Sequence, residues 1–231
     1  MKTGKNNLNL IIFPGGGSPN NKLYKNVYAL LSTSAKNYGY KKVDTSVIYP
    51  GHIDSAGHVN AKLTLDGAIE VAYLKVKEYD EKGLKYDILG RSFGTIVAVK
   101  IATDKKLNHL RKIILWGPPP YWLIWQMFSR DLKENIKIAK TKGLHIDKKF
   151  FLSAKPIESM LQSLEYPTVI ATGTKDPYSK PFYINYLWNC VAHKTNFHFR
   201  VIEDAPHEVT KEKCSPEVVT AYLECLFKNN F

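Results

Sequence analysis

Cysteine is scarce in this chain of 231 residues, which has three: Cys190, Cys214 and Cys225. An odd, sparse set of thiols does not build a disulfide framework, and no two of them have the C-x-x-C spacing of a zinc or redox site. We therefore expect reduced thiols with a structural role.

Long apolar runs are also missing from the start of the chain. Residues 1 to 9 are mostly polar, and the run from Leu10 to Phe13 is too short for a signal-peptide core or a membrane span. The sequence therefore predicts a soluble, cytoplasmic protein with no membrane span.

Arginine is rare although the formal net charge is +12. Lysines are scattered through every segment and do not form one dense stripe, and the arginines are only Arg91, Arg111, Arg130 and Arg200. Base reading favours bidentate arginine contacts on a concentrated basic surface. We therefore expect solvated lysine faces and no nucleic-acid partner.

What the chain does have is enough apolar sequence for one full core, with 44% hydrophobic and 12% aromatic residues. Short apolar or β-branched runs alternate with segments of helical period, which is typical of βαβ units around a parallel sheet. The expected strands are Asn9 to Phe13, Lys42 to Tyr49, Tyr86 to Leu89, Lys112 to Trp116, Thr168 to Thr172 and Phe197 to Ile202. The expected helices are Leu23 to Asn37, Leu65 to Tyr79, Gly94 to Thr103, Pro181 to Val191 and Pro216 to Phe227. We predict a single α/β domain over residues 1–231, with a mostly parallel sheet of about six strands and helices on both faces.

One connection is too long for this alternation. After Gly117 and three prolines, about 45 residues pass before the strand at Thr168. We expect a small helical cap or lid insertion over about residues 118–165. Its aromatic start either lines an acyl-binding pocket or packs on the sheet as core, and the residues concerned are Tyr121, Trp122, Trp125, Met127 and Phe128.

The strongest chemical signal is a G-x-S-x-G motif from Gly90 to Gly94, centred on Ser92. It follows an apolar strand and precedes an apolar helix, which is the context of a nucleophile elbow. A helix N-terminus beside the serine favours developing negative charge. The alternative is a serine that only caps a helix in a tight turn.

This succession of strand, motif and helix resembles the α/β-hydrolase superfamily. The resemblance implies that the chain adopts the α/β-hydrolase fold. In that family the nucleophile is followed along the chain by an acid and then a histidine. The loop after Thr168 to Thr172 offers Asp176 as the acid, and the loop after the last strand offers His207 as the general base. A turn aspartate and a surface-loop histidine are the structural alternatives, and Glu203 and Asp204 are reserve acids.

The glycine-rich turn after the first strand resembles the oxyanion-hole turn of the same family. There the Gly16 amide, or that of Gly15 or Gly17, would act with the Phe93 amide to bind a tetrahedral oxyanion. Pro14 departs from the family, because a histidine commonly precedes these glycines. This glycine-rich segment lacks the last glycine of the dinucleotide-binding motif G-x-G-x-x-G, and no G-K-[ST] of a P-loop follows it. Nucleotide binding is therefore disfavoured.

Two other features have competing interpretations. His52, Asp54 and His58 are metal-ligand types, but their segment resembles a turn-forming loop of the family, and we predict neither a metal nor a cofactor. Arg91 could recognise a substrate carboxylate, although a residue at the elbow more often has a structural contact.

The expected function is cleavage of a carboxylic ester or thioester through an acyl-enzyme, with a small-molecule acyl substrate. A peptidase or amidase using the same triad is one alternative, and a non-catalytic binding module of this fold is the other. The oligomeric state is left open.

Overall fold

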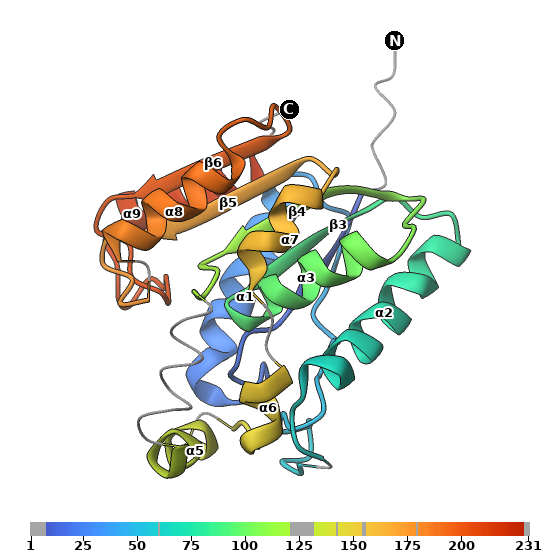
Figure 1. Cartoon of the computed structure of the whole chain (residues 1–231), viewed down its shortest axis with the longest axis vertical. Helices are drawn as coiled ribbons and strands as arrows, with labels where there is room; N and C mark the ends of the chain where they lie inside the picture. Colours follow the sequence, from blue (N-terminus) through green and yellow to red (C-terminus); the bar gives the residue numbers. More distant parts are fainter. Residues whose placement is uncertain are drawn as a thin grey trace.

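A six-stranded, entirely parallel sheet forms the centre of the protein, in the order β2-β1-β3-β4-β5-β6 (Figure 1). The computed structural model describes residues 8–59, 61–120, 132–141, 143–153, 156–178 and 180–228. The strands are β1 (Asn9–Phe13), β2 (Lys42–Asp44), β3 (Tyr86–Arg91), β4 (Leu110–Trp116), β5 (Thr168–Gly173) and β6 (Phe197–Ile202). The predicted parallel α/β sheet is confirmed.

Helices cover both faces of this sheet. They are α1 (Lys22–Asn37), α2 (Leu65–Glu81), α3 (Phe93–Asp104), α5 (Leu132–Thr141), α6 (Lys148–Ser153), α7 (Ile157–Ser163), α8 (Pro181–Val191) and α9 (Pro216–Phe227). Helices α1 and α9 share one hydrophobic cluster with the sheet, and α2, α3, α7 and α8 share the other. Among the helices described here, none is long and apolar enough to cross a bilayer.

The alternation of side chains along β1 explains why this strand is apolar from Leu10 to Phe13. Leu10 and Ile12 pack into the cluster of α1 and α9, whereas Ile11 and Phe13 pack into the cluster of α2 and α3. Successive side chains of a strand point to opposite faces, so a strand covered on both faces needs apolar residues at every position.

The second strand is shorter than predicted. We expected a strand from Lys42 to Tyr49, but β2 ends at Asp44. There the Asp44 carboxylate accepts hydrogen bonds from the amide and the hydroxyl of Ser46, at 3.0 and 2.6 Å, which turns the chain out of the sheet. Val47 and Tyr49 are buried beyond this turn, so their apolar character reflects core packing.

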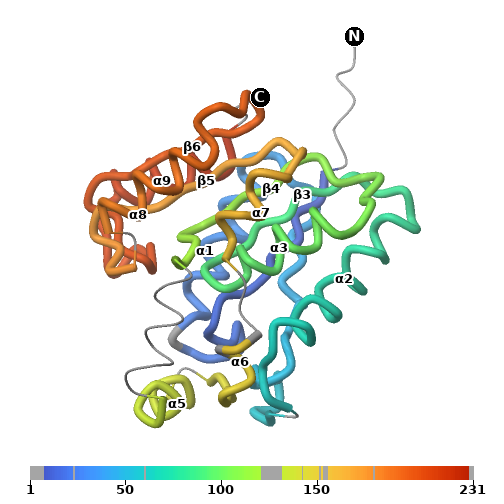
Figure 2. Tube along the Cα trace, in the orientation of Figure 1, coloured from blue at the N-terminus to red at the C-terminus, as the bar shows by residue number. Residues whose placement is uncertain are grey.

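The segment between β4 and β5 contains α5, α6 and α7. Helices α5 and α6 lie together at one end of the molecule, and α7 returns along the face that α3 covers (Figure 2). Helix α7 packs against α3 and α8. A single domain with a cap over about residues 118–165 stays a prediction. The cap residues expected to line the pocket lie outside the described residues, and they are Tyr121, Trp122, Trp125, Met127 and Phe128.

Candidate active site

Ser92 occupies a strained turn between β3 and α3. Its φ of 50° and ψ of −120° lie where non-glycine residues are rare, and its amide donates to the Trp116 carbonyl at 2.8 Å. A side chain at Gly90 would collide with the backbone of Gly94, and one at Gly94 would collide with the carbonyl of Phe13. The two glycines therefore let strand and helix approach closely enough to form the sharp turn expected of a nucleophile elbow.

Asp176 and His207 form a direct pair at the ends of neighbouring strands. The imidazole Nδ1 lies 2.7 Å from the Asp176 Oδ2, and the other carboxylate oxygen accepts from the Tyr178 amide at 2.9 Å. Asp176 is buried, and the Tyr178 ring packs edge-on against the imidazole with ring centroids 4.7 Å apart. This pairing fixes the orientation of the imidazole and directs Nε2 away from the carboxylate.

The reserve acids have other partners. Glu203 accepts a hydrogen bond from Thr174 at 3.3 Å, and Asp204 pairs with Lys175 at 2.8 Å on the exposed surface. Asp176 is therefore the carboxylate that the structure brings to His207.

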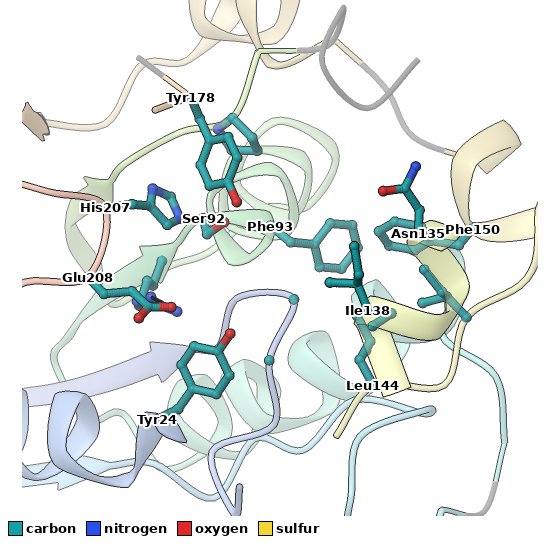
Figure 3. A pocket seen from close by; sticks show the side chains of 16 residues that line it. Tyr24, Ser92, Phe93, Asn135, Ile138, Leu144, Phe150, Tyr178, His207 and Glu208 are labelled. Atoms are coloured by element: carbon teal, nitrogen blue, oxygen red, sulfur yellow. Dashed lines mark ion pairs between the residues drawn. The ribbon is translucent and has the colours of Figure 1, made fainter. Parts of the chain in front are cut away.

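Ser92 and His207 line the same pocket, and their side chains are neighbours in Figure 3. The side of the pocket with His207 also carries polar groups of Tyr24, Tyr178 and Glu208. The opposite side is mostly apolar and comes from α3, α5, α6 and the segment between α5 and α6. Figure 3 shows on this side Phe93, Asn135, Ile138, Leu144 and Phe150. Ala139 and Ile146 also line the pocket.

The glycine turn after β1 reaches this pocket. Gly16 and Gly17 line it, as does Phe93 at the start of α3. The Gly15 amide donates to the buried Tyr28 hydroxyl at 3.2 Å, which commits it to a structural bond. Gly16 is thus better placed than Gly15 to offer an amide to a bound oxyanion.

Sequence reasoning missed several residues around the pocket. Gly117 has a φ of +56°, and a methyl group there would lie 3.1 Å from the His207 ring and 3.3 Å from Asp176. The only sequence signal was its place before three prolines at the end of β4. Tyr178 and the pocket residues of α5 and α6 carried no motif, because tertiary packing alone brings them to Ser92.

The segment considered as a metal site forms turns. The Asp54 carboxylate accepts from the amides of Ala56 and His58 at 2.9 and 2.8 Å. His52 is buried against Tyr49, and this burial lowers its pKa to about 3. His52 is therefore a neutral side chain of the interior at physiological pH.

The order of parallel strands and the elbow after β3 define the α/β-hydrolase fold. No family model matches the sequence, and no curated protein matches it. Solved structures share the fold at low identity. An esterase of Pyrococcus furiosus superimposes with a TM-score of 0.66 and 15% identity, over 95% of this chain and 81% of that one.

Two further structures are similar. A monoacylglycerol lipase of Paleococcus ferrophilus gives a TM-score of 0.62 at 16% identity, over 95% of this chain and 93% of the lipase. An alpha-beta serine hydrolase homologue from Coxiella burnetii gives 0.59 at 17% identity, over 97% and 85% of the two chains. These likenesses establish the fold that was predicted from the sequence.

Proposed function

We propose that this protein is a serine hydrolase that cleaves a carboxylic ester or thioester, with Ser92 as nucleophile, His207 as general base and Asp176 as the orienting acid. The observation that carries the proposal is the His207–Asp176 contact of 2.7 Å in a pocket that Ser92 also lines. Esterase and lipase names among proteins of the same fold agree with it.

The reaction follows from these positions. His207 Nε2 accepts the proton of the Ser92 hydroxyl as Oγ attacks the substrate carbonyl. The amides of Gly16 and Phe93 donate to the oxyanion of the tetrahedral intermediate. The imidazolium then protonates the leaving alcohol or thiol, and Asp176 stabilises its charge meanwhile.

Water completes the cycle. With His207 again as base, a water molecule attacks the acyl-enzyme, and the carboxylic acid leaves as Ser92 regains its proton. The reaction needs only these side chains and backbone amides, so the proposal includes neither a metal nor a cofactor.

The pocket's two sides suggest how a substrate lies in it. An apolar acyl group fits against Phe93, Leu144 and Phe150, because burial of hydrocarbon there removes apolar surface from water. The leaving group would then lie toward Tyr24 and Tyr178. This arrangement favours an acyl ester over a peptide substrate.

A two-part assay tests the function. We expect hydrolysis of p-nitrophenyl esters, with kcat lowered by about three to six orders of magnitude in Ser92→Ala and in His207→Ala. A parallel set of aminoacyl nitroanilides tests the peptidase alternative. Faster cleavage of the anilides than of every ester would overturn the ester assignment, and no activity on either set would favour a binding module.

A further inference from the structure

Arg91 is a buried cation directly beside the proposed nucleophile. Its side chain is 2% exposed, and it is among the largest fully buried side chains of the described residues. A guanidinium removed from water destabilises the fold unless other groups compensate its charge. The groups around Arg91 therefore show how its charge is compensated and which segments its side chain contacts.

Two aromatic rings and one carboxylate lie beside the guanidinium, and its charge also acts on the buried hydroxyl of Tyr28. Its central carbon lies 5.3 Å from the centroid of the Tyr24 ring and 5.6 Å from that of Trp116. Arg91 Nη2 lies 3.7 Å from Glu208 Oε1, a distance that gives charge attraction without a hydrogen bond. Glu208 is the residue after His207, so the pair links the two chain segments that carry the proposed nucleophile and base.

The guanidinium also touches the glycine turn. A methyl group on Gly15 would lie 3.0 Å from Arg91 Nη1 and 3.1 Å from the Ser92 Cβ. Arg91 thus contacts the glycine turn and the histidine loop, while its own backbone belongs to the elbow.

We propose that Arg91 and Glu208 are a positioning pair that holds the glycine turn and the His207 loop in register with Ser92. This inference rests on the proposed serine-hydrolase function. Arg91 lines the pocket, but only 2% of its side chain is exposed, and Glu208 beside it would repel a substrate carboxylate, so Arg91 is poorly suited to bind such an anion. Misplacement of catalytic groups by about 1 Å can reduce a rate about a hundredfold, which is the kind of loss the pair would prevent.

The second partner of Glu208 provides a matched control. Lys213 bonds the other carboxylate oxygen at 2.5 Å, but its own side chain is 54% exposed. Burial alone would raise the pKa of Glu208, but the Lys213 bond and the Arg91 charge hold it below its usual range. Because an exposed pair contributes little, loss of Lys213 should leave the position of His207 nearly unchanged.

The test compares ester hydrolysis by Arg91→Met, Arg91→Lys, Glu208→Gln and the Arg91→Met/Glu208→Gln double variant. We expect Arg91→Met to lower kcat about tenfold to a hundredfold with KM within about twofold, and Arg91→Lys to recover part of the loss. The double variant should be no slower than Arg91→Met, because one interaction is lost in both. Lys213→Met should keep kcat within about twofold.

The pH dependence of kcat/KM separates a positioning role from a purely structural one, because a purely structural role would leave the pH of its acidic limb unchanged. Among the described residues, the charged and titratable groups on the His207 side of the pocket are Asp176, Tyr178, Tyr24, Glu208, Arg91 and, through Glu208, Lys213. Loss of the Glu208 anion disfavours the imidazolium, so the acidic limb of kcat/KM moves to lower pH in Glu208→Gln. Loss of the Arg91 cation moves it to higher pH in Arg91→Met.

Tyr40→Phe controls for destabilisation, because it removes a buried 2.6 Å bond to Asp87 at the other end of β3. If Tyr40→Phe lowers both the melting temperature and kcat as much as Arg91→Met, the pair acts only through stability and the inference is wrong. Wild-type hydrolysis that depends on Ser92 but is insensitive to Arg91→Met also overturns it. Absence of hydrolysis that depends on Ser92 instead overturns the proposed function.

Discussion

His207 and Asp176 are 31 residues apart in the chain, yet their side chains meet at 2.7 Å. The contact follows from the sheet, because β5 and β6 are parallel neighbours with Gly173 opposite Ile202. Loops that leave the carboxyl ends of adjacent parallel strands emerge at the same edge. The acid and the histidine therefore come together through topology, and Ser92 arrives at that edge from β3.

The role of the acid can be tested with Asp176→Asn. An asparagine amide in this position favours the wrong imidazole tautomer and cannot balance the imidazolium charge, so we expect kcat to fall about 10³- to 10⁴-fold. Steady-state ester kinetics measure this. Asp204→Asn is the matched control, since Asp204 is paired with Lys175 on the surface. An equal loss in both variants would refute the assignment of Asp176.

Gly117→Ala tests the packing beneath the histidine. An alanine there adds backbone strain of about 1–2 kcal/mol, since φ is +56°, and places a methyl 3.1 Å from the imidazole. We expect kcat to fall about tenfold to a hundredfold as His207 shifts. Gly83→Ala has similar strain at φ +62° but nothing within 4 Å, so it should lose stability and keep kcat. Equal kcat values for the two variants would contradict the prediction.

The apolar side of the pocket can be tested with Leu144→Ala. Removal of this buried side chain should destabilise the fold by about 2–5 kcal/mol and move the best substrate toward longer acyl chains. Esters of graded acyl length measure the preference. Leu187→Ala removes a buried leucine of the same cluster from α8, outside the pocket lining, and should alter stability alone. An unchanged preference in Leu144→Ala would place the acyl group elsewhere.

Burial of His52 predicts a pH dependence of stability. The pKa of His52 is about 3 in the folded protein and about 6.5 in the unfolded chain. As the pH falls, the unfolded chain therefore binds a proton at this histidine before the folded protein does. The stability due to neutral His52 is complete above about pH 6.5 and is lost toward pH 3.

Denaturant titrations at pH 7 and pH 5 measure this effect. Between these values the free energy of unfolding should fall about 2 kcal/mol more in the wild type than in His52→Gln. His193→Gln, at an exposed position, should follow the wild type. A parallel decline in all three proteins would contradict the neutral burial of His52.

The sequence was sufficient to predict the α/β-hydrolase fold. Runs of mostly apolar residues covered on both faces identified the central strands β1, β3, β4 and β5. The close contacts at Gly90 and Gly94 require glycine in the turn that contains Ser92. The same reasoning overextended β2, because a buried loop containing Val47 and Tyr49 has the composition of a strand.

Contacts between distant segments were not predictable. Arg91 lies inside the motif and had two interpretations, and only the positions of Tyr24, Trp116 and Glu208 distinguish them. Likewise Gly117 and Leu144 gain their place at the site from the packing of β4 and α5 around Ser92. Such neighbours depend on tertiary structure, and local sequence patterns do not encode them.

The most direct measurement of the central claim is labelling with a fluorophosphonate probe, followed by mass spectrometry of the modified peptide. Such a probe forms a covalent bond with a serine whose hydroxyl is activated by a neighbouring base. We expect one adduct on Ser92 in the wild type and none in Ser92→Ala, with much slower labelling in His207→Ala. Equal labelling of the wild type and Ser92→Ala would contradict the account.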